Sequence, residues 1–197
     1  MTYSDLVATI AAYMHRSDLA TISSTFVALA ESRIYRDCRV KEMITTQTIA
    51  YTGNTMPLPD RYQELRSVTY RGGPWGPYAL RSVGQHLIPL MSEAGTSPQA
   101  YSTEGTLLQI EPGADGKEFD LLYYAGLAPL GVSNQSNAML DAYPGMFLYG
   151  SLLEAAIYVQ DPQLTAQFTQ SYNTEVQNAN STNAWSRWGE SPTMSTA

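Results

Sequence analysis

The clearest pattern of apolar and polar positions in this 197-residue chain lies between Leu140 and Pro162. Apolar residues recur there every three or four positions, which is the period of a helix with one buried face. Pro144 suits a first helical turn, where its missing N–H group has no partner to lose. Asp161 and Pro162 combine a capping side chain with a second such proline, so a new helix follows with almost no loop. The sequence therefore predicts a helical hairpin with stripes Leu148, Leu152, Ala155, Ala156 and Val159, then Leu164, Phe168, Tyr172 and Val176.

Two more helices are predicted near the start of the chain. Thr2 lies three residues before Asp5, a weak form of the capping box, and precedes a short helix over Tyr3–Met14. After a break at Ser17-Asp18, a longer helix is expected over about Ile22–Asp37. Its expected stripe is Ile22, Phe26, Leu29, Ala30, Arg33 and Ile34, and its remaining surface carries Glu31, Arg33, Arg36 and Asp37.

The middle of the chain changes to a strand-like pattern. Thr52–Thr55 is a plausible hairpin turn, and 71–77 is a Gly/Pro-rich loop long enough to protrude. Ser82–Met91 is ambiguous and could be a short helix. The last three strands are separated by short turns, so we expect them to form a meander. The predicted strands are Met43–Tyr51, Tyr62–Tyr70, Ala100–Thr103, Thr106–Glu111 and Glu118–Ala125.

This order of elements predicts an α+β fold. The helices of 1–42 and of 137–188 are expected to form one bundle, with 43–126 as an inserted small β-sheet or barrel. Residues 189–197 have the composition of a flexible tail. The chain is long enough for one sizeable core, or for a helical domain with a second small layer.

Composition limits the class of protein further. The single cysteine, Cys38, excludes an internal disulfide framework and a multi-cysteine zinc site, and we expect its thiol to be buried at a helix end. No apolar run approaches the ~18 residues of a membrane span, and no signal sequence is visible. We therefore expect a soluble protein made in a reducing cytoplasm. The 14 tyrosines fit either wettable interfaces or β-strands.

The net charge of −7 is unevenly distributed. Residues 1–81 sum to +2, whereas residues 82–197 sum to −9. An acidic half without a basic patch argues against tight nucleic-acid binding, because contacts to phosphate supply most of that affinity. It remains compatible with a surface past which DNA slides without sticking.

Candidate catalytic groups are few. His15 follows a helix end, where a capping or surface role is favoured over catalysis. Glu154 could act as a general acid beside Glu175 or Asp141, although any 18 acidic residues offer such pairs. We predict no catalytic, cofactor-binding or metal-binding residue. The residues expected to anchor an interface are Trp185, Arg187 and Trp188, and Trp75 in the protruding loop, although one C-terminal indole could instead pack onto the protein's own bundle.

The chain resembles head-to-tail adaptor proteins of short-tailed bacteriophages. Four passages carry the resemblance, in the family's order and across nearly the whole chain. They are Tyr13–Leu19, the helix with Ala30-Glu31-Ser32-Arg33 ending at Arg39, the Leu58-Pro59-Asp60 corner before a strand, and Phe147–Ile157 with the Asp161-Pro162 break after it. The loop at 71–77 and the chain after Trp188 depart from the family's pattern.

The resemblance implies a structural protein of the virion neck, made in the host bacterial cytoplasm. It implies a ring, usually of twelve copies, between the portal protein and the tail nozzle or tail tube, with DNA passing through its channel. It also implies a helical bundle with a β insertion. Two other classes stay open: a virion-associated cell-wall hydrolase, and a related head-completion or tail-tube ring component.

Two expectations concern assembly. We expect the free protein to be largely monomeric and to form a ring only on the portal. The Asn/Ser/Thr-rich stretch 178–183 has low helix propensity, so the second hairpin helix is expected to fray there. Residues from about Ala184 onward are then expected to become ordered against the portal.

Overall fold

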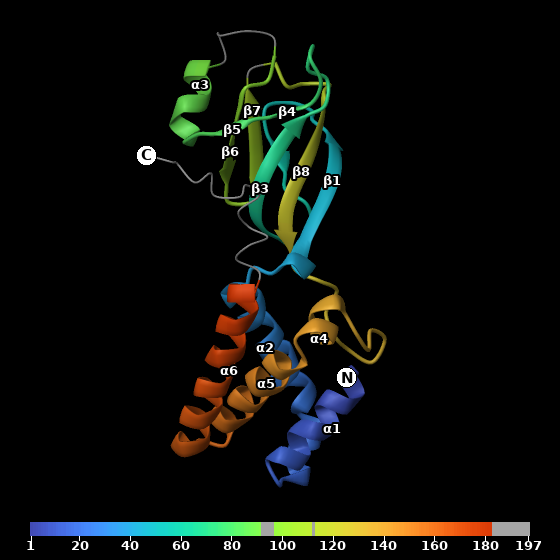
Figure 1. The fold of residues 1–197 in the computed structure, drawn as a ribbon, viewed down its shortest axis with the longest axis vertical. Helices are drawn as coiled ribbons and strands as arrows, with labels where there is room; N and C mark the ends of the chain where they lie inside the picture. The colour runs from blue at the N-terminus through green and yellow to red at the C-terminus, as the bar shows by residue number, and fades with distance from the viewer. Residues whose placement is uncertain (92–96, 112, 183–197) are drawn as a thin grey trace, which may run out of the picture. The chain divides into compact units, whose positions relative to one another are not determined.

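A computed structural model describes residues 1–91, 97–111 and 113–182. Its contacts divide the chain into two units (Figure 1). The helical unit combines Met1–Met43 with the chain from Leu127 onward, and the β unit is Ile44–Gly126. The predicted α+β class is confirmed.

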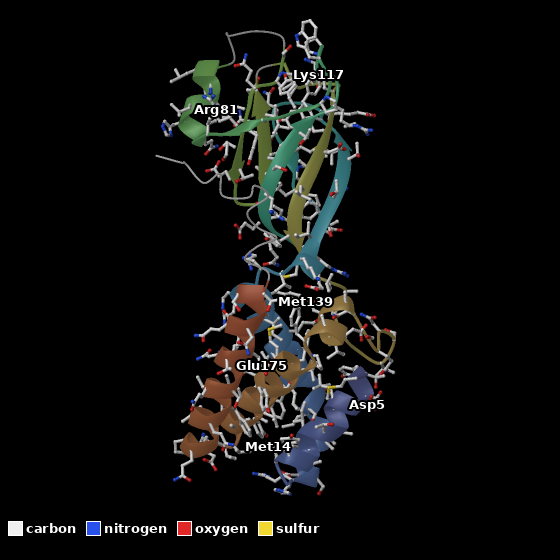
Figure 2. The ribbon with its side chains drawn as sticks, in the orientation of Figure 1. Asp5, Met14, Arg81, Lys117, Met139 and Glu175 are labelled. Carbon is white, nitrogen blue, oxygen red and sulfur yellow. The ribbon has the colours of Figure 1, made fainter. Side chains whose placement is uncertain are left out.

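The first helix, α1 (Tyr3–Tyr13), begins at the predicted capping box. The Asp5 amide donates to the Thr2 hydroxyl at 3.1 Å, and the Thr2 amide donates to the Asp5 carboxylate at 2.9 Å. These bonds lower the pKa of Asp5. Figure 2 shows Asp5 and Met14 at the two ends of this helix. The helix ends where His15 adopts a left-handed conformation with φ of 51°.

The second long helix, α2 (Ser23–Asp37), follows the 3₁₀ helix η1 (Ser17–Thr21). Two positions differ from the predicted stripe. The pattern predicts that Leu29 is buried, but it is 49% exposed, and that Glu31 is at the surface, but it is only 5% exposed. The carboxylate of Glu31 accepts hydrogen bonds from the Tyr35 hydroxyl at 3.0 Å and the Leu130 amide at 3.3 Å. A buried acid is tolerated there because these donors satisfy it, and it ties the segment before the hairpin to α2.

The predicted helical hairpin is confirmed by α5 (Pro144–Tyr158) and α6 (Pro162–Thr182), which follow the short α4 (Ala138–Ala142). Asp161 caps α6 by accepting from the amides of Gln163 and Leu164 at 2.9 and 3.0 Å. Gly150 allows close helix packing, because a Cβ added there would lie 3.2 Å from the Cβ of Ala30 on α2 and 3.4 Å from the ring of Tyr172 on α6.

The expected fraying of α6 from residue 178 is wrong. The helix continues to Thr182, and Ala179 is buried. The Asn180 side chain accepts from the Arg39 amide at 3.2 Å and donates to the Asp37 carbonyl at 3.1 Å. Tertiary contacts with the end of α2 therefore override the low helix propensity of this stretch.

The β unit contains two four-stranded sheets, ordered β1-β8-β3-β4 and β2-β7-β6-β5. Pairing is antiparallel except between β5 and β6. Short helices η2 (Lys41–Met43), η3 (Gln85–Leu87) and α3 (Ile88–Met91) flank or interrupt the strands, and the last two occupy the ambiguous region. The strands are β1 (Ile44–Ala50), β2 (Met56–Pro57), β3 (Tyr62–Tyr70), β4 (Tyr78–Ala79), β5 (Arg81–Ser82), β6 (Ala100–Glu104), β7 (Leu107–Glu111) and β8 (Glu118–Ala125).

Two predicted strand connections are wrong. Residues 52–55 do not close a hairpin, because β1 pairs with β8 whereas β2 pairs with β7 in the other sheet. The last three strands do not form a meander either: β6 and β7 pair, but β8 lies between β1 and β3. In that central position β8 buries Phe119, Leu121 and Tyr123 in the core shared by the two sheets.

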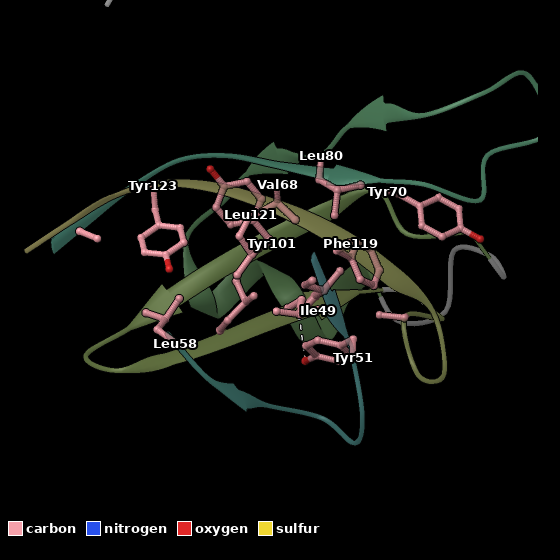
Figure 3. Packing of buried hydrophobic residues seen from close by; sticks show 14 residues of the cluster. Ile49, Tyr51, Leu58, Val68, Tyr70, Leu80, Tyr101, Phe119, Leu121 and Tyr123 are labelled. Atoms are coloured by element: carbon pink, nitrogen blue, oxygen red, sulfur yellow. Dashed lines mark hydrogen bonds between the residues drawn. The ribbon is translucent and has the colours of Figure 1, made fainter. Parts of the chain in front are cut away.

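Five of the fourteen residues in this core are aromatic (Figure 3). The Phe119 ring lies 6.0 Å from the Tyr51 ring and 5.4 Å from the Tyr70 ring, measured between centroids. The buried Tyr51 hydroxyl accepts from the Ile110 amide at 3.1 Å and donates to the Asn54 carbonyl at 2.6 Å. Burial raises the pKa of Tyr51. Tyrosine thus serves as a core residue here because its polar end is satisfied.

Candidate interaction surfaces

Glu154, the acid considered for catalysis, forms an ion pair within the helical unit. Glu154 does not pair with Glu175 or Asp141; its Oε1 instead accepts from Arg33 on α2, at 2.9 Å from Nε and 2.5 Å from Nη2. Cys38 is fully buried, with its Sγ 3.3 Å from the Met146 sulfur. Within the described residues, no group of three or more His, Cys, Asp or Glu is placed to hold a metal ion.

An exposed apolar groove of about 300 Å³ lies between the first half of α2 and the end of α5. The Phe26 ring is its buried floor and lies 5.6 Å from the Tyr158 ring. Leu29, Ile157 and Tyr158 are respectively 49%, 47% and 60% exposed. Grouped exposed apolar side chains of this kind are typical of interaction sites. The lining residues are Ile22, Thr25, Phe26, Leu29, Glu154, Ile157 and Tyr158.

Ion pairs neutralise the charges near this groove. Glu154, one of its lining residues, is held by Arg33. Arg16, which interacts electrostatically with Tyr158, forms a two-point contact with Asp18 at 3.0 and 2.5 Å. The contact with Arg16 lowers the pKa of Asp18. The groove therefore offers apolar surface beside charges that are already compensated.

A second exposed surface is the tip of the β3–β4 hairpin. Trp75 is 98% exposed there, as expected of the protruding loop. The strands meet at the Tyr70–Tyr78 pair, whose rings make an edge contact at 5.5 Å. Lys117 lies 5.5 Å from the centroid of the Tyr70 ring. The base of the tip is thus braced by aromatic contacts, whereas the indole has almost no cover of its own.

The other predicted anchors, Trp185, Arg187 and Trp188, lie outside the described residues. Their role at an interface stays a prediction, as does that of Trp75.

The helices after the β unit are nearly free of charge. Residues 127–182 contain four acidic residues and no lysine or arginine. In α6, Glu175 is the only Asp, Glu, Lys or Arg; Figure 2 shows its position on the helix. The exposed side of α6 is instead rich in amides and hydroxyls. Its exposed polar residues are Gln163, Gln167, Gln170, Asn173, Thr174, Gln177, Asn178, Ser181 and Thr182.

Sequence reasoning missed the apolar groove. Leu29 fits the helical stripe by spacing, so the pattern assigned it to the core. Ile157 and Tyr158 lie off the α5 stripe, and they were a usable signal: two large apolar residues next to each other near a helix end. A helix that is apolar on more than one side has either a second neighbour or an exposed contact face.

Comparison with protein families identifies the chain's relatives. The family model described as "SU10 adaptor protein" matches residues 1–195. Among curated proteins, none matches the chain. No helix among the described residues has the length and apolarity needed to cross a membrane. Because the family match covers nearly the whole chain, the chain belongs to the SU10 adaptor family, an adaptor family of phage head-tail connectors.

Proposed function

We propose that this member of the SU10 adaptor family assembles as a ring, of twelve copies, that joins the portal protein to the tail nozzle or tail tube. The family assigns the chain a structural adaptor role in the virion. The observation that carries the proposal is the match over residues 1–195, because it takes in both units and not only one of them.

The charge distribution supports a DNA channel through this ring. DNA has to pass an adaptor without being held, and phosphate is held chiefly by lysine and arginine. The segment 127–182 contains four acidic residues and no lysine or arginine. We propose that the exposed side of α6, which carries amides and hydroxyls but no lysine or arginine, is part of the channel lining, where it does not hold DNA.

The two units are proposed as separate working parts. Helices of 1–42 and 137–188 form the bundle that builds the ring, and the insertion 43–126 reaches a partner with Trp75. Trp185, Arg187 and Trp188, with the tail 189–197, are proposed to dock on the portal. Tryptophan and arginine supply much of the binding energy at interfaces, which supports this assignment.

The test uses DNA-filled heads that lack this protein. Purified chain is added, and the portal vertex is imaged by cryo-electron microscopy. A symmetric ring below the portal, followed by attachment of tails, is the expected result. Density elsewhere on the particle, or an asymmetric single copy, contradicts the ring. Turnover of peptidoglycan by the purified chain contradicts a purely structural role.

The anchors are tested in the same assay with a chain lacking residues 184–197. We expect attachment to the head to be lost and the melting temperature to be unchanged. Retained attachment with a melting temperature several degrees lower would mean that the tryptophans belong to the protein's own core. If rings of the chain lacking residues 184–197 attach to the head and the melting temperature is unchanged, the docking role is contradicted.

A further inference from the structure

We infer that neighbouring copies in the ring join by a knob-in-groove contact, in which Val132 of one copy enters the apolar groove of the next. The inference rests on the proposed function, because it takes the ring as given and assigns its subunit contact. Both surfaces belong to the helical unit.

The knob is a single exposed side chain on a well-braced turn. Val132 is 86% exposed between Gly131 and Asn134. The amides and carbonyls of Gly131 and Asn134 exchange two hydrogen bonds, at 2.9 and 3.1 Å. The Gln135 side chain donates to the Val132 carbonyl at 2.9 Å and accepts from the Ser4 hydroxyl at 2.8 Å. A side chain presented on such a turn loses little conformational entropy on binding, which favours association.

The chemistry of the two surfaces is complementary. The groove exposes Leu29, Ile157 and Tyr158 beside compensated ion pairs. The segment 127–137 around the knob has no Asp, Glu, Lys or Arg. Each copy has a net charge of −7, and a contact made of uncharged surfaces adds no repulsion between copies. An uncharged apolar knob and a neutral apolar groove make such a contact.

The asymmetry of the contact fits a ring. A contact between identical patches closes a dimer, whereas a contact between two different patches leaves one of each free and continues to a ring or a filament. The groove is formed by α2 and α5, whereas the knob lies in the connection before α4. Each contact uses the knob of one copy and the groove of the next, so an open chain of copies keeps one free knob and one free groove. Closing the ring joins these last two surfaces.

The inference is tested by cross-linking between copies. One chain carries Leu29→Cys and a second carries Val132→Cys; both positions are exposed, and the native Cys38 is fully buried. The two chains are mixed, assembled on adaptor-free heads and treated with a short bis-maleimide. We expect a cross-linked dimer from the mixture and none from either chain alone. A matched mixture with Ala28→Cys, an exposed position one residue before Leu29 in α2, is expected to cross-link at least about tenfold less.

The outcomes separate the inference from the proposed function. If imaging shows rings but the mixture does not cross-link, the knob-in-groove contact is wrong and the ring stands. Cross-linking of either chain with itself would show a contact between identical patches and would also overturn the inference. A cross-link from Leu29→Cys to a head protein would assign the groove to the portal instead. If wild-type chain forms no ring on the heads, the proposed function itself fails.

A second pair of variants measures the contribution of the knob. Val132→Asp introduces a charge into the apolar contact, and Ser133→Asp places the same charge on the next residue of the same turn. We expect Val132→Asp to raise the concentration needed for ring assembly at least about tenfold, with Ser133→Asp close to wild type. Equal effects of the two substitutions would overturn the inference. Circular dichroism checks that both variants remain folded.

Discussion

The two units of this protein differ in whether their backbone hydrogen bonds join residues near to or far from each other in the chain. In the helical unit, the backbone hydrogen bonds of each helix lie within that helix, and small residues such as Ala30 and Gly150 let the helices approach closely. In the β unit, the central strand β8 pairs with β1, whose residues lie 68 to 80 positions earlier in the chain, and the core combines aromatic rings with aliphatic side chains. The helices of the helical unit can therefore be predicted from local sequence, whereas the strand order of the β unit depends on residues far apart in the chain.

The two units also differ in how they use tyrosine. The sequence allows two explanations for the 14 tyrosines, namely interfaces and β-strands. Tyr51, Tyr70, Tyr101 and Tyr123 are all buried in the β core. The apolar surface of the helical unit, by contrast, combines Leu29 and Ile157 with the single ring of Tyr158. Five of the seven buried tyrosines thus belong to the β unit, and the exposed apolar groove is lined by both aliphatic and aromatic side chains.

The largest expected effect separates the two cores. Phe119→Ala in β8 and Phe147→Ala in α5 each truncate a fully buried ring and should cost about 3–5 kcal/mol. Because the units have separate cores, we expect calorimetry to show that each substitution lowers the unfolding temperature of one unit only. A single transition, shifted equally by both variants, would show that the two units unfold together.

The next effect sharpens the picture of helix packing. The Tyr172 hydroxyl on α6 donates to the Asp37 carboxylate on α2 at 2.9 Å. Tyr172→Phe should cost about 1.5–3 kcal/mol at neutral pH, since a hydrogen bond to a charged acceptor is lost. The exposed Tyr13→Phe is the control and should leave stability unchanged within about 0.5 kcal/mol.

The same pair predicts a pH dependence. Burial, together with the Asp37 contact, raises the pKa of Tyr172 in the folded protein above its ordinary value. A raised pKa means that its stabilising contribution is complete below the unfolded pKa of about 10 and is lost as pH rises above it. The stability difference between wild type and Tyr172→Phe should therefore shrink above about pH 10. A difference that grows with pH would contradict this assignment.

A smaller effect of opposite sign is expected inside the helical core. Ser151 is fully buried, and within the described residues its hydroxyl is the one buried side-chain polar atom without a hydrogen-bond partner. Ser151→Ala should therefore stabilise the helical unit by about 1 kcal/mol, measured by chemical denaturation. A loss of stability would show that a bound water satisfies this hydroxyl. In the β core, where Tyr51 is fully bonded, Tyr51→Phe should destabilise instead.

The smallest effect on stability is expected at the β3–β4 tip. Trp75→Ala should change the free energy of unfolding by less than about 0.5 kcal/mol, because the indole is almost wholly exposed. Under the proposed function it should nevertheless weaken binding of the β unit's partner. Unchanged tail attachment by a Trp75→Ala ring would remove this residue from the interface.

The sequence alone determined the features that depend on neighbouring residues. The Thr2–Asp5 capping box, the Asp161 cap and the strand limits Tyr62–Tyr70 are all present in the structure. A cap is made by groups within three residues of each other, and helical periodicity reports one helix at a time. The α+β class followed from these local signals, and the ordered passages from Tyr13 to Ile157 identified the family.

Tertiary structure alone decided which distant residues meet. Alternation along β8 predicts a strand but does not say that β1 and β3 flank it, since hydrogen bonding between strands is the same for any partner. Spacing likewise placed Leu29 inside and Glu31 outside, but the neighbours of α2 reversed both. Spacing alone places Arg33 both in the apolar stripe and on the surface. In the structure it forms an ion pair with Glu154 of α5. Burial is a property of the surfaces that come together, and a helical pattern names the face of a helix but not what will cover it.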